Sequence, residues 1–274
     1  FMATEMGEGC RRLDPSSVAD LCPQAHAPAG AILSTHDLRV ESREALPRLA
    51  AWLAEVHGVR FRFGSAVVGM ETGRVALANG EALAADAIFV CPGDDWASLF
   101  PSIYAEESIT RCKLQMLRTA PQPVGWKLGP ALCAGLTMAH YDSFGFCPSL
   151  PELRRHFEAT RPSETHGGIH VLVSQNGDGG LTLGDTHEYG ATHDPFQREE
   201  LDQLVLAYLD GFARIPERRI AEHWTGYYPK LSGRSELVLN PMPGVTLVNA
   251  LGGAGMTLSF GLAEEIVAVG APLS

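Results

Sequence analysis

Residues 249–261 read NALGGAGMTLSFG and join two different patterns through a cluster of glycines. Before the glycines, Val245–Ala250 is a mostly apolar run typical of a strand in a parallel sheet, and after them Leu258–Ile266 has apolar residues at helical spacing. Glycine lets the backbone approach a ligand closely, and a helix start presents N–H groups and partial positive charge. The stretch therefore predicts either a ligand-facing strand-to-helix connection or a tight turn without a ligand.

A second buried strand is predicted at Ala87–Cys91, an uninterrupted apolar run that stops at Pro92-Gly93. Such runs are typical of strands covered on both faces, and the end of a parallel strand commonly faces a ligand. Upstream, Ser42–His57 has apolar residues at helical spacing, with Ser42 able to cap its start and Gly58 able to end it. These elements predict one α/β lobe.

Short β segments separate this helix from the second strand, and Asn79-Gly80 marks a two-residue hairpin turn among them. The segments are Val59–Phe63, Ala66–Met70, Arg74–Ala78 and Glu81–Leu83. They predict a β-meander attached to the same lobe.

A different pattern begins after about residue 104, where longer β segments prevail. Ile169–Ser174 and Gly180–Gly184 are joined by the turn residues Asn176–Gly179. Two helical stretches, Leu150–Ala159 and Gln197–Phe212, interrupt these strands. The pattern predicts a second, antiparallel lobe.

The composition is that of an ordinary globular protein, since 45% of the 274 residues are hydrophobic and 19% are charged. The 32 acidic residues outnumber the 21 basic ones, for a net charge of −11, and no run of Lys or Arg is long enough to follow a phosphate backbone. A nucleic-acid partner is therefore not expected. No apolar stretch reaches the roughly 18–20 residues of a membrane span and no signal pattern opens the sequence, so we expect a cytoplasmic protein.

The sequence predicts no metal site. Its six cysteines are scattered without CxxC pairs, which favours reduced thiols over zinc or a disulfide framework. His166 and His170 have ligand-like spacing, but the two glycines between them argue against a helix that would bring both rings together. The Asp94-Asp95 pair could supply acid/base carboxylates, although a loop cap is the simpler interpretation.

The order of the predicted elements is helix, meander, GEALAADAIFVCPG (80–93), a β-rich stretch and GGAGMT (252–257). This order resembles the D-amino-acid oxidase / sarcosine oxidase superfamily of FAD-dependent oxidoreductases over nearly the whole chain. CKLQMLRT (112–119) and GDTHEY (184–189) further resemble a branch of that superfamily associated with phosphonate catabolism.

The resemblance implies an α/β fold of two lobes: a partial Rossmann-type FAD-binding lobe, 43–103 and 241–274, and an antiparallel β-rich substrate lobe, 1–42 and 104–240. The superfamily's Gly-x-Gly-x-x-Gly loop and the acid that follows it have no counterpart here, and the sequence opens at Phe1-Met2 without a strand-turn-helix unit. We therefore expect an N-terminally truncated chain that is inactive alone and binds FAD weakly or not at all.

Cofactor-binding residues follow from the same resemblance. Val67 corresponds to a valine whose backbone faces the adenine, and Cys91 and Gly93 to positions near the diphosphate. The positions against the pyrimidine end of the flavin, where N–H donors stabilise negative charge on reduction, are Gly252, Gly253, Ala254, Gly255, Met256 and Thr257. Some members attach the flavin through a cysteine where this chain has Gly226, so we expect non-covalent FAD.

Substrate contacts are expected from a binding cage rather than a catalytic triad, because hydride transfer to a flavin needs orientation and a neutral amine. Tyr228 corresponds to a substrate-pocket tyrosine, and Thr257 stands where some relatives have a lysine that binds carboxylate. Another anion-binding group is therefore expected. The candidates are Tyr228, His187 and Lys230 as catalytic residues and Lys113, Tyr189 and Arg234 as substrate-binding residues, each of which could instead be a solvated or structural side chain.

The expected activity is oxidation of a small amine or amino acid-like substrate to an imine that hydrolyses to a carbonyl compound, with oxygen or another electron acceptor. The branch resemblance implies an aminophosphonate substrate. The alternative is a non-catalytic binding or scaffold module that keeps the fold without the cofactor.

Overall fold

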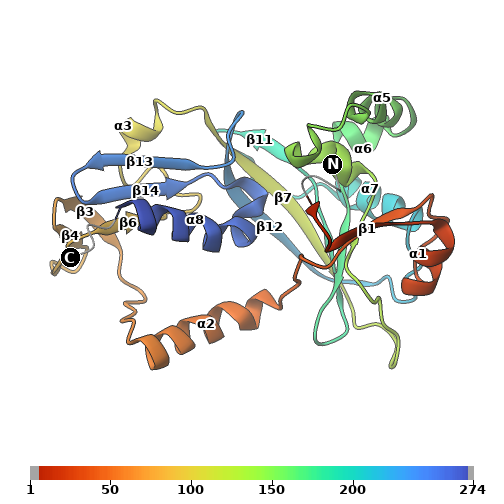
Figure 1. Ribbon diagram of the computed structural model, residues 1–274, viewed down its shortest axis with the longest axis horizontal. Helices are drawn as coiled ribbons and strands as arrows, with labels where there is room; N and C mark the ends of the chain where they lie inside the picture. The colour runs from red at the N-terminus through yellow and green to blue at the C-terminus, as the bar shows by residue number, and fades with distance from the viewer. Residues whose placement is uncertain (1–5, 271–274) are drawn as a thin grey trace. The chain divides into compact units, whose positions relative to one another are not determined.

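Two long strands, β7 (Ile109–Thr119) and β12 (Ile220–Leu231), pair with each other and run through both of the units into which the chain divides (Figure 1). The computed structural model describes residues 6–270. The first unit comprises the described residues up to Gly58, Leu114–Glu188 and Asp194–Gly226; the second comprises Val59–Lys113, Tyr189–His193 and the described residues from Tyr227 onward. The mixed α/β fold class is confirmed, and the predicted lobe boundaries stay a prediction.

The first unit is built on most of a six-stranded sheet in the order β11-β7-β10-β9-β8, with β12 paired to β7; β11, like β7 and β12, has residues in both units. Its shorter strands are β8 (Leu132–Cys133), β9 (Leu172–Gln175), β10 (Leu181–Gly184) and β11 (Glu188–Gly190). β10 is antiparallel to both β7 and β9, which confirms the predicted antiparallel lobe.

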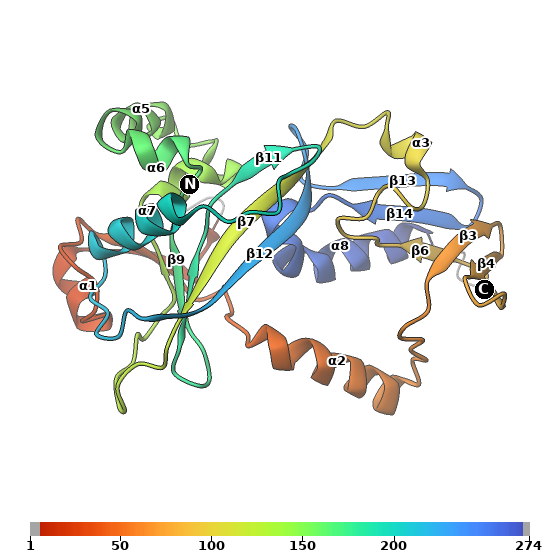
Figure 2. The ribbon, with the colours of Figure 1, turned by 180° about the vertical axis from the view of Figure 1, so that it is seen from behind.

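Helices cover one side of this sheet (Figure 2): α5 (Leu150–Thr160), α6 (Pro162–His166) and α7 (Glu199–Asp210). Val205 and Leu209 of α7 pack with Val173 of β9 and Leu183 of β10 in one buried cluster. Apart from the helix at Ser42–His57, the remaining elements of the unit are β1 (Cys10–Leu13), α1 (Pro15–Leu21), β2 (Ala31–Ser34), α4 (Leu136–His140) and the short 3₁₀ helix η2 (Asp142–Phe144).

The start of α7 is tied to β7 by the buried side chain of Gln115. Arg198 is the N-cap residue of α7 but makes no side-chain capping bond. Instead, Arg198 N–H donates to Gln115 Oε1 at 2.8 Å, while Gln115 Nε2 donates to Arg198 O at 3.1 Å and to Asp202 Oδ1 at 2.9 Å. A strand residue therefore supplies the cap that the helix sequence lacks.

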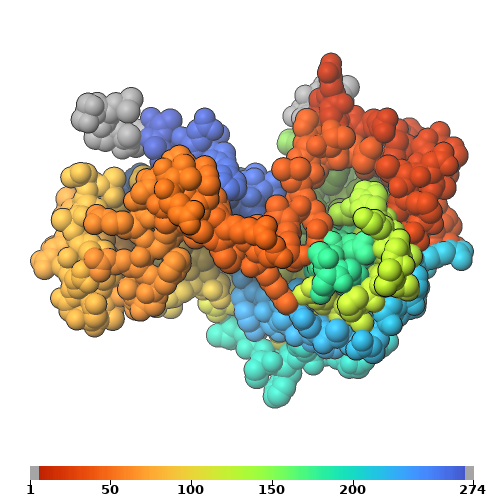
Figure 3. Space-filling view, turned by 90° about the horizontal axis from the view of Figure 1, so that it is seen from below, coloured from red at the N-terminus to blue at the C-terminus, as the bar shows by residue number. Residues whose placement is uncertain are grey.

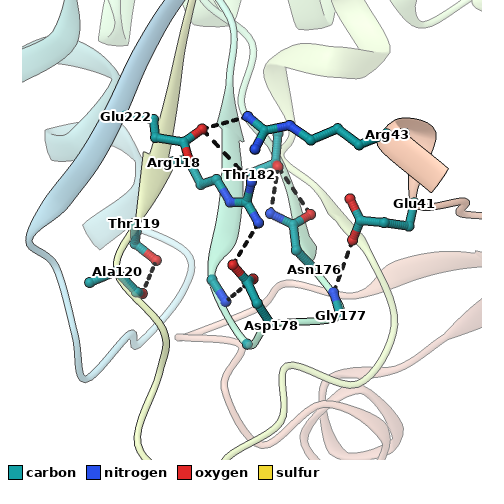
Figure 4. Close-up of polar contacts among 12 residues, drawn as sticks. Glu41, Arg43, Arg118, Thr119, Ala120, Asn176, Gly177, Asp178, Thr182 and Glu222 are labelled. Carbon is teal, nitrogen blue, oxygen red and sulfur yellow. Dashed lines mark hydrogen bonds and ion pairs between the residues drawn. The ribbon is translucent and has the colours of Figure 1, made fainter.

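α2 (Ser42–His57) confirms the predicted helix, and Gly58 ends it in the left-handed conformation with φ 67°. The predicted cap is wrong, because Glu41 and not Ser42 is the N-cap residue. The Glu41 carboxylate accepts instead from Gly177 N–H at 2.9 Å, and Arg43 pairs with Glu222 at 2.5 Å (Figure 4). None of the residues of α2 is buried, and the helix lies, in orange, on the surface seen in Figure 3.

The second unit contains a three-stranded sheet of β13 (Leu237–Met242), β14 (Val245–Asn249) and β6 (Ile88–Val90), followed by η3 (Gly252–Ala254) and α8 (Gly255–Gly270). β14 is parallel to β6 and antiparallel to β13, which confirms the parallel pair expected from the two apolar runs. The prediction that β6 is buried on both faces is wrong. Phe89 is 46% exposed, while its neighbours Ile88 and Val90 are in the core.

The predicted meander is confirmed as β3 (Val67–Glu71), β4 (Arg74–Leu77) and β5 (Ala82–Ala84), and the short helix α3 (Pro101–Tyr104) follows β6. The predicted strand at Val59–Phe63 is wrong. Phe61 and Phe63 stack on each other, with ring centroids 5.3 Å apart, rather than pairing along a neighbouring strand. None of the helices within residues 6–270 has the length and apolar character that a membrane crossing requires.

Candidate functional site

The glycine segment forms a sharp connection from β14 to α8 in the second unit. Asn249 ends the strand with a buried side chain whose Oδ1 accepts from Ala250 N–H at 2.7 Å and whose Nδ2 donates to the Tyr104 hydroxyl at 3.4 Å. Ala250 and Gly252 then adopt left-handed backbone conformations, with φ 59° and 60°. The predicted strand-turn-helix connection is therefore confirmed.

Tyr228 of β12 lies against this connection. A Cβ added to Gly253 would be 3.5 Å from the Tyr228 hydroxyl oxygen and 3.6 Å from the carbon that bears it. The two segments are also joined by a backbone bridge between Lys230 and Leu251. The structure thus brings the predicted pocket tyrosine together with the predicted flavin-facing segment.

Lys230 and Tyr189 form a second contact beside Tyr228. Tyr228 and Lys230 are two residues apart on β12, so they project from the same face of the strand. The Lys230 Nζ lies 5.4 Å from the centroid of the Tyr189 ring, within the range of a cation–π interaction. Tyr228 therefore adjoins the glycine segment, and the ammonium group two residues further along β12 lies against the Tyr189 ring.

The other two basic candidates have different surroundings. Arg234 forms an ion pair with Glu107, which partly neutralises its charge. Lys113 is only 1% exposed on β7. Both belong to the second unit, whereas His187 belongs to the first.

Arg111 is half-buried and makes contacts that the sequence did not suggest. Its guanidinium lies 4.5 Å from the centroid of the Trp96 ring, its Nη2 donates to Asp94 O at 2.8 Å, and its Nη1 donates to Ala191 O at 3.3 Å. The nearby Asp95 accepts from two backbone N–H groups of the following turn, which supports its interpretation as a loop cap. The only sequence signal was the tryptophan that follows the strand-end acidic pair.

The remaining predicted cofactor residues lie on the meander and at the end of β6. Val67 is half-buried at the start of β3, opposite Leu77, and Cys91 is exposed directly after β6. Gly93 has φ 65°, and no atom lies within 4 Å of the position that a Cβ would take. The turn after β6 therefore needs glycine for its backbone and leaves room for a ligand.

In the first unit, His187 lies in a group of three histidine rings. The ring centroid of His140 lies 4.0 Å from that of His170 and 4.2 Å from that of His187, and the latter two are 4.7 Å apart. His187 Nδ1 lies 2.9 Å from Gly168 O, and Asp185 Oδ1 lies 3.4 Å from His170 Nε2. Sequence spacing did not suggest this group, because its members are 30 and 17 residues apart.

Burial dominates the electrostatics of this histidine group. It lowers the pKa of His170 to about 2, with His140 and His187 adding to the effect, and it raises the pKa of Asp185 to about 7. Burial, followed by the charge of Asp185, raises the pKa of the adjacent Tyr141 to about 12. His170 is therefore a neutral imidazole at physiological pH.

The chain matches the family model described as FAD dependent oxidoreductase, DAO, over residues 2–269 and belongs to that family. FAD, the predicted cofactor, is the cofactor of this family. A search of curated proteins gave no match.

Among solved structures, the chain is similar to L-proline dehydrogenase from P. horikoshii, with 16% identity and a TM-score of 0.70 over 98% of this chain and 67% of that one. It is similar to glycine oxidase from Geobacillus kaustophilus, with 18% identity and a TM-score of 0.68 over 97% of this chain and 63% of that one. It is also similar to iminodiacetate oxidase from Chelativorans sp. BNC1, with 20% identity and a TM-score of 0.66 over 98% of this chain and 66% of that one. The structural similarity establishes the fold alone, because the sequence identities are low. The chain spans only about two thirds of the length of each of these structures.

The residues at the glycine segment fit the flavin end of FAD. The connection is made of glycine and alanine backbone, Gly253 and Met256 are exposed, and the 16-residue α8 begins there, so its N-terminus can stabilise negative charge on a bound ring. The chain has no counterpart of the Gly-x-Gly-x-x-Gly phosphate loop. The fit therefore concerns the flavin ring and not the diphosphate.

Proposed function

We propose that the protein oxidises a small amine or amino acid-like substrate to an imine, which then hydrolyses to a carbonyl compound. The supporting observation is the contact of Tyr228 with Gly253, together with Lys230, which is bridged to Leu251 through its backbone and lies near the Tyr189 ring. FAD supplies the hydride acceptor in this chemistry, and oxygen or another acceptor takes up the electrons.

The chain's own residues would bind and orient the substrate. Tyr228 offers a hydroxyl group at the glycine segment, and Lys230 offers a positive charge two residues further along the same strand. An acidic substrate group would pair with that ammonium, while its amine end would lie toward the glycine segment. Gly226 cannot form a thioether with the flavin, which supports non-covalent binding.

Within this substrate class we propose an amine that bears a phosphonate group. Support comes from the branch resemblance of residues 112–119 and 184–189 and from Lys230, because a dianionic phosphonate needs cationic donors. Lys113, Arg234 and His187 stay as further proposed donors. A cytoplasmic location likewise stays a prediction.

The test uses the protein with any sequence that precedes Phe1 in its gene. The purified protein is examined for the visible absorption bands of bound flavin and is then mixed anaerobically with glycine, sarcosine or an N-alkylated aminoalkylphosphonate. Bleaching of the flavin by any of these amines supports amine oxidation. Bleaching by glycine or sarcosine but never by the aminophosphonate removes the phosphonate proposal, and a colourless protein that takes up no FAD favours the scaffold alternative.

A further inference from the structure

Three histidines from separate segments of the first unit offer nitrogen ligands to a common point. His140 ends α4, His170 lies two residues before β9, and His187 lies three residues after β10; one ring nitrogen of each lies within 4.8 Å of those of the other two. We propose that these three side chains bind one divalent transition-metal ion, with the Asp185 carboxylate beside it. This site replaces the sequence-based expectation of no metal, and it does not depend on the proposed amine oxidation.

The hydrogen bond of His187 orients its ring for metal binding. Gly168 O can only accept, so the proton of the neutral ring lies on Nδ1, 2.9 Å away, and Nε2 carries the lone pair. A backbone carbonyl that accepts from the second ring nitrogen is a common feature of metal-binding histidines. The tautomer of His187 is thereby the one that a metal ion requires.

His170 supplies the second observation. Its side chain is 2% exposed, Thr137 Oγ1 lies 3.5 Å from its Nδ1, and its Nε2 has no hydrogen-bond partner. Buried polar atoms are nearly always satisfied, so an unpartnered ring nitrogen inside a histidine group indicates a missing ligand. A metal ion would bind the lone pair of this nitrogen without adding a proton to the buried ring.

The Asp185 carboxylate lies close to the Nε2 atoms of both His170 and His187. Its Oδ1 is 3.4 Å from His170 Nε2 and likewise has no hydrogen-bond partner, and its Oδ2 is 3.8 Å from His187 Nε2. Donor atoms around a tetrahedral zinc ion, with bonds of about 2.0–2.2 Å, are separated by roughly 3.3 Å. The 3.4 Å separation is close to this value and the 3.8 Å separation is wider, and the carboxylate would balance part of the charge of a buried dication.

The chemistry of the donors selects the type of ligand. Imidazole nitrogens suit Zn²⁺, Cu²⁺, Ni²⁺ and Fe²⁺, whereas Mg²⁺ and Ca²⁺ prefer oxygen donors. A phosphate-like anion at this point would lie against the Asp185 carboxyl group, whose Oδ1 is 3.4 Å from His170 Nε2, and two anionic groups so close repel each other. The donor set of the cluster therefore suits a transition-metal cation.

The experiment is zinc binding to protein that has been stripped with a chelator and dialysed. We expect one zinc ion per chain by mass spectrometry under native conditions and by calorimetric titration. His140→Gln and His187→Gln should each weaken binding at least about tenfold, since loss of even an outer-sphere partner of a ligand costs that much. His166→Gln is the matched control: His166 is an exposed histidine four residues from His170, and its loss should leave the affinity unchanged.

A measurement on the unchanged protein guards against variants that fail to fold. Co²⁺ added to the stripped protein should give visible ligand-field bands that zinc abolishes. Zinc at a hundredfold excess over its Kd should raise the melting temperature by about 5 °C or more. Three outcomes would each overturn the proposal. They are absence of stoichiometric zinc, equal loss of zinc affinity in the His166 and His140 variants, and binding of inorganic phosphate in place of the metal.

Discussion

The Tyr228 hydroxyl lies over the backbone of Gly253, where an added Cβ would meet it at an ordinary van der Waals distance of 3.5 Å. The neighbouring Gly252 differs: it has φ 60°, and no atom lies within 4 Å of its absent Cβ. One glycine permits close approach of a ring, and the other permits a backbone conformation. The two positions should therefore respond differently to the same substitution.

Gly252→Ala should lower the free energy of unfolding by about 1–2 kcal/mol, because alanine is strained in the left-handed region. Gly253→Ala should change it by less than about 0.5 kcal/mol, since its Cβ makes only a normal contact. Gly261→Ala, inside α8 with open space around it, is the control and should stabilise the protein by up to about 1 kcal/mol. Urea unfolding measures all three. Equal losses of unfolding free energy in the variants at positions 252 and 253 would contradict the different roles assigned to the two glycines.

Tyr228→Phe should lower kcat/KM for amine oxidation about threefold to tenfold, which corresponds to loss of one hydrogen bond to the substrate. Tyr227→Phe is the matched control, because adjacent residues of a strand point to opposite faces. Stopped-flow reduction of the flavin gives the comparison. If the Tyr227 variant is the slower one, Tyr228 does not contact the substrate.

Lys230→Gln should raise KM for acidic amines about tenfold, because a charged hydrogen bond contributes roughly 1.5–3 kcal/mol. Arg234→Gln should have a smaller effect, since the guanidinium is already paired with Glu107. A neutral amine of the same size serves as the control substrate, and its KM should not change. Similar KM values for both variants with the acidic amine would remove Lys230 as the anion-binding residue.

Asp178→Asn should make stability less dependent on pH in the acidic range. Gly180 N–H, at 3.0 Å, and then Arg118, at 2.8 Å, lower the pKa of Asp178 below its ordinary value of 3.8 (Figure 4). A lowered folded-state pKa stabilises the protein above pH 3.8, and the stabilisation is lost as pH falls through the folded-state value.

The wild type should therefore be more stable than the Asp178→Asn variant by less than about 1 kcal/mol at neutral pH, with the difference vanishing in acid. Urea unfolding at a series of pH values measures this. Asp20→Asn, at an exposed position of α1, should show no such trend. A difference that persists unchanged in acid would show that Asp178 acts without its charge.

Local sequence patterns were sufficient to predict helix ends and turns, where the conformation depends on the residue itself. Gly58 ends α2 and Asn79-Gly80 turns the meander, because both need backbone conformations that few residues adopt. Burial was harder to predict. Phe89 belongs to an apolar run and is still 46% exposed, and Val59–Phe63 has β-forming residues but no strand to pair with.

The strand-to-helix connection of the candidate site was predictable from its own glycine motif, whereas Tyr228 was expected only from the family resemblance. The histidine group was not, because its members come from a helix end and two strand ends, and only tertiary structure joins them. The sequence pairs His170 with His166, four residues away, whereas its ring neighbours in the structure are His140 and His187. Chain separation was thus the wrong measure of proximity.

The cap that Gln115 supplies to α7 has a consequence for the order of folding. A helix start without a local cap frays in isolation, and here the capping residue is 83 positions away in the chain. We therefore expect the first turn of α7 to become stable together with β7, and its amide hydrogens to gain protection together with those of the strand. Helix initiation in this unit would then be a long-range event, coupled to strand pairing rather than preceding it.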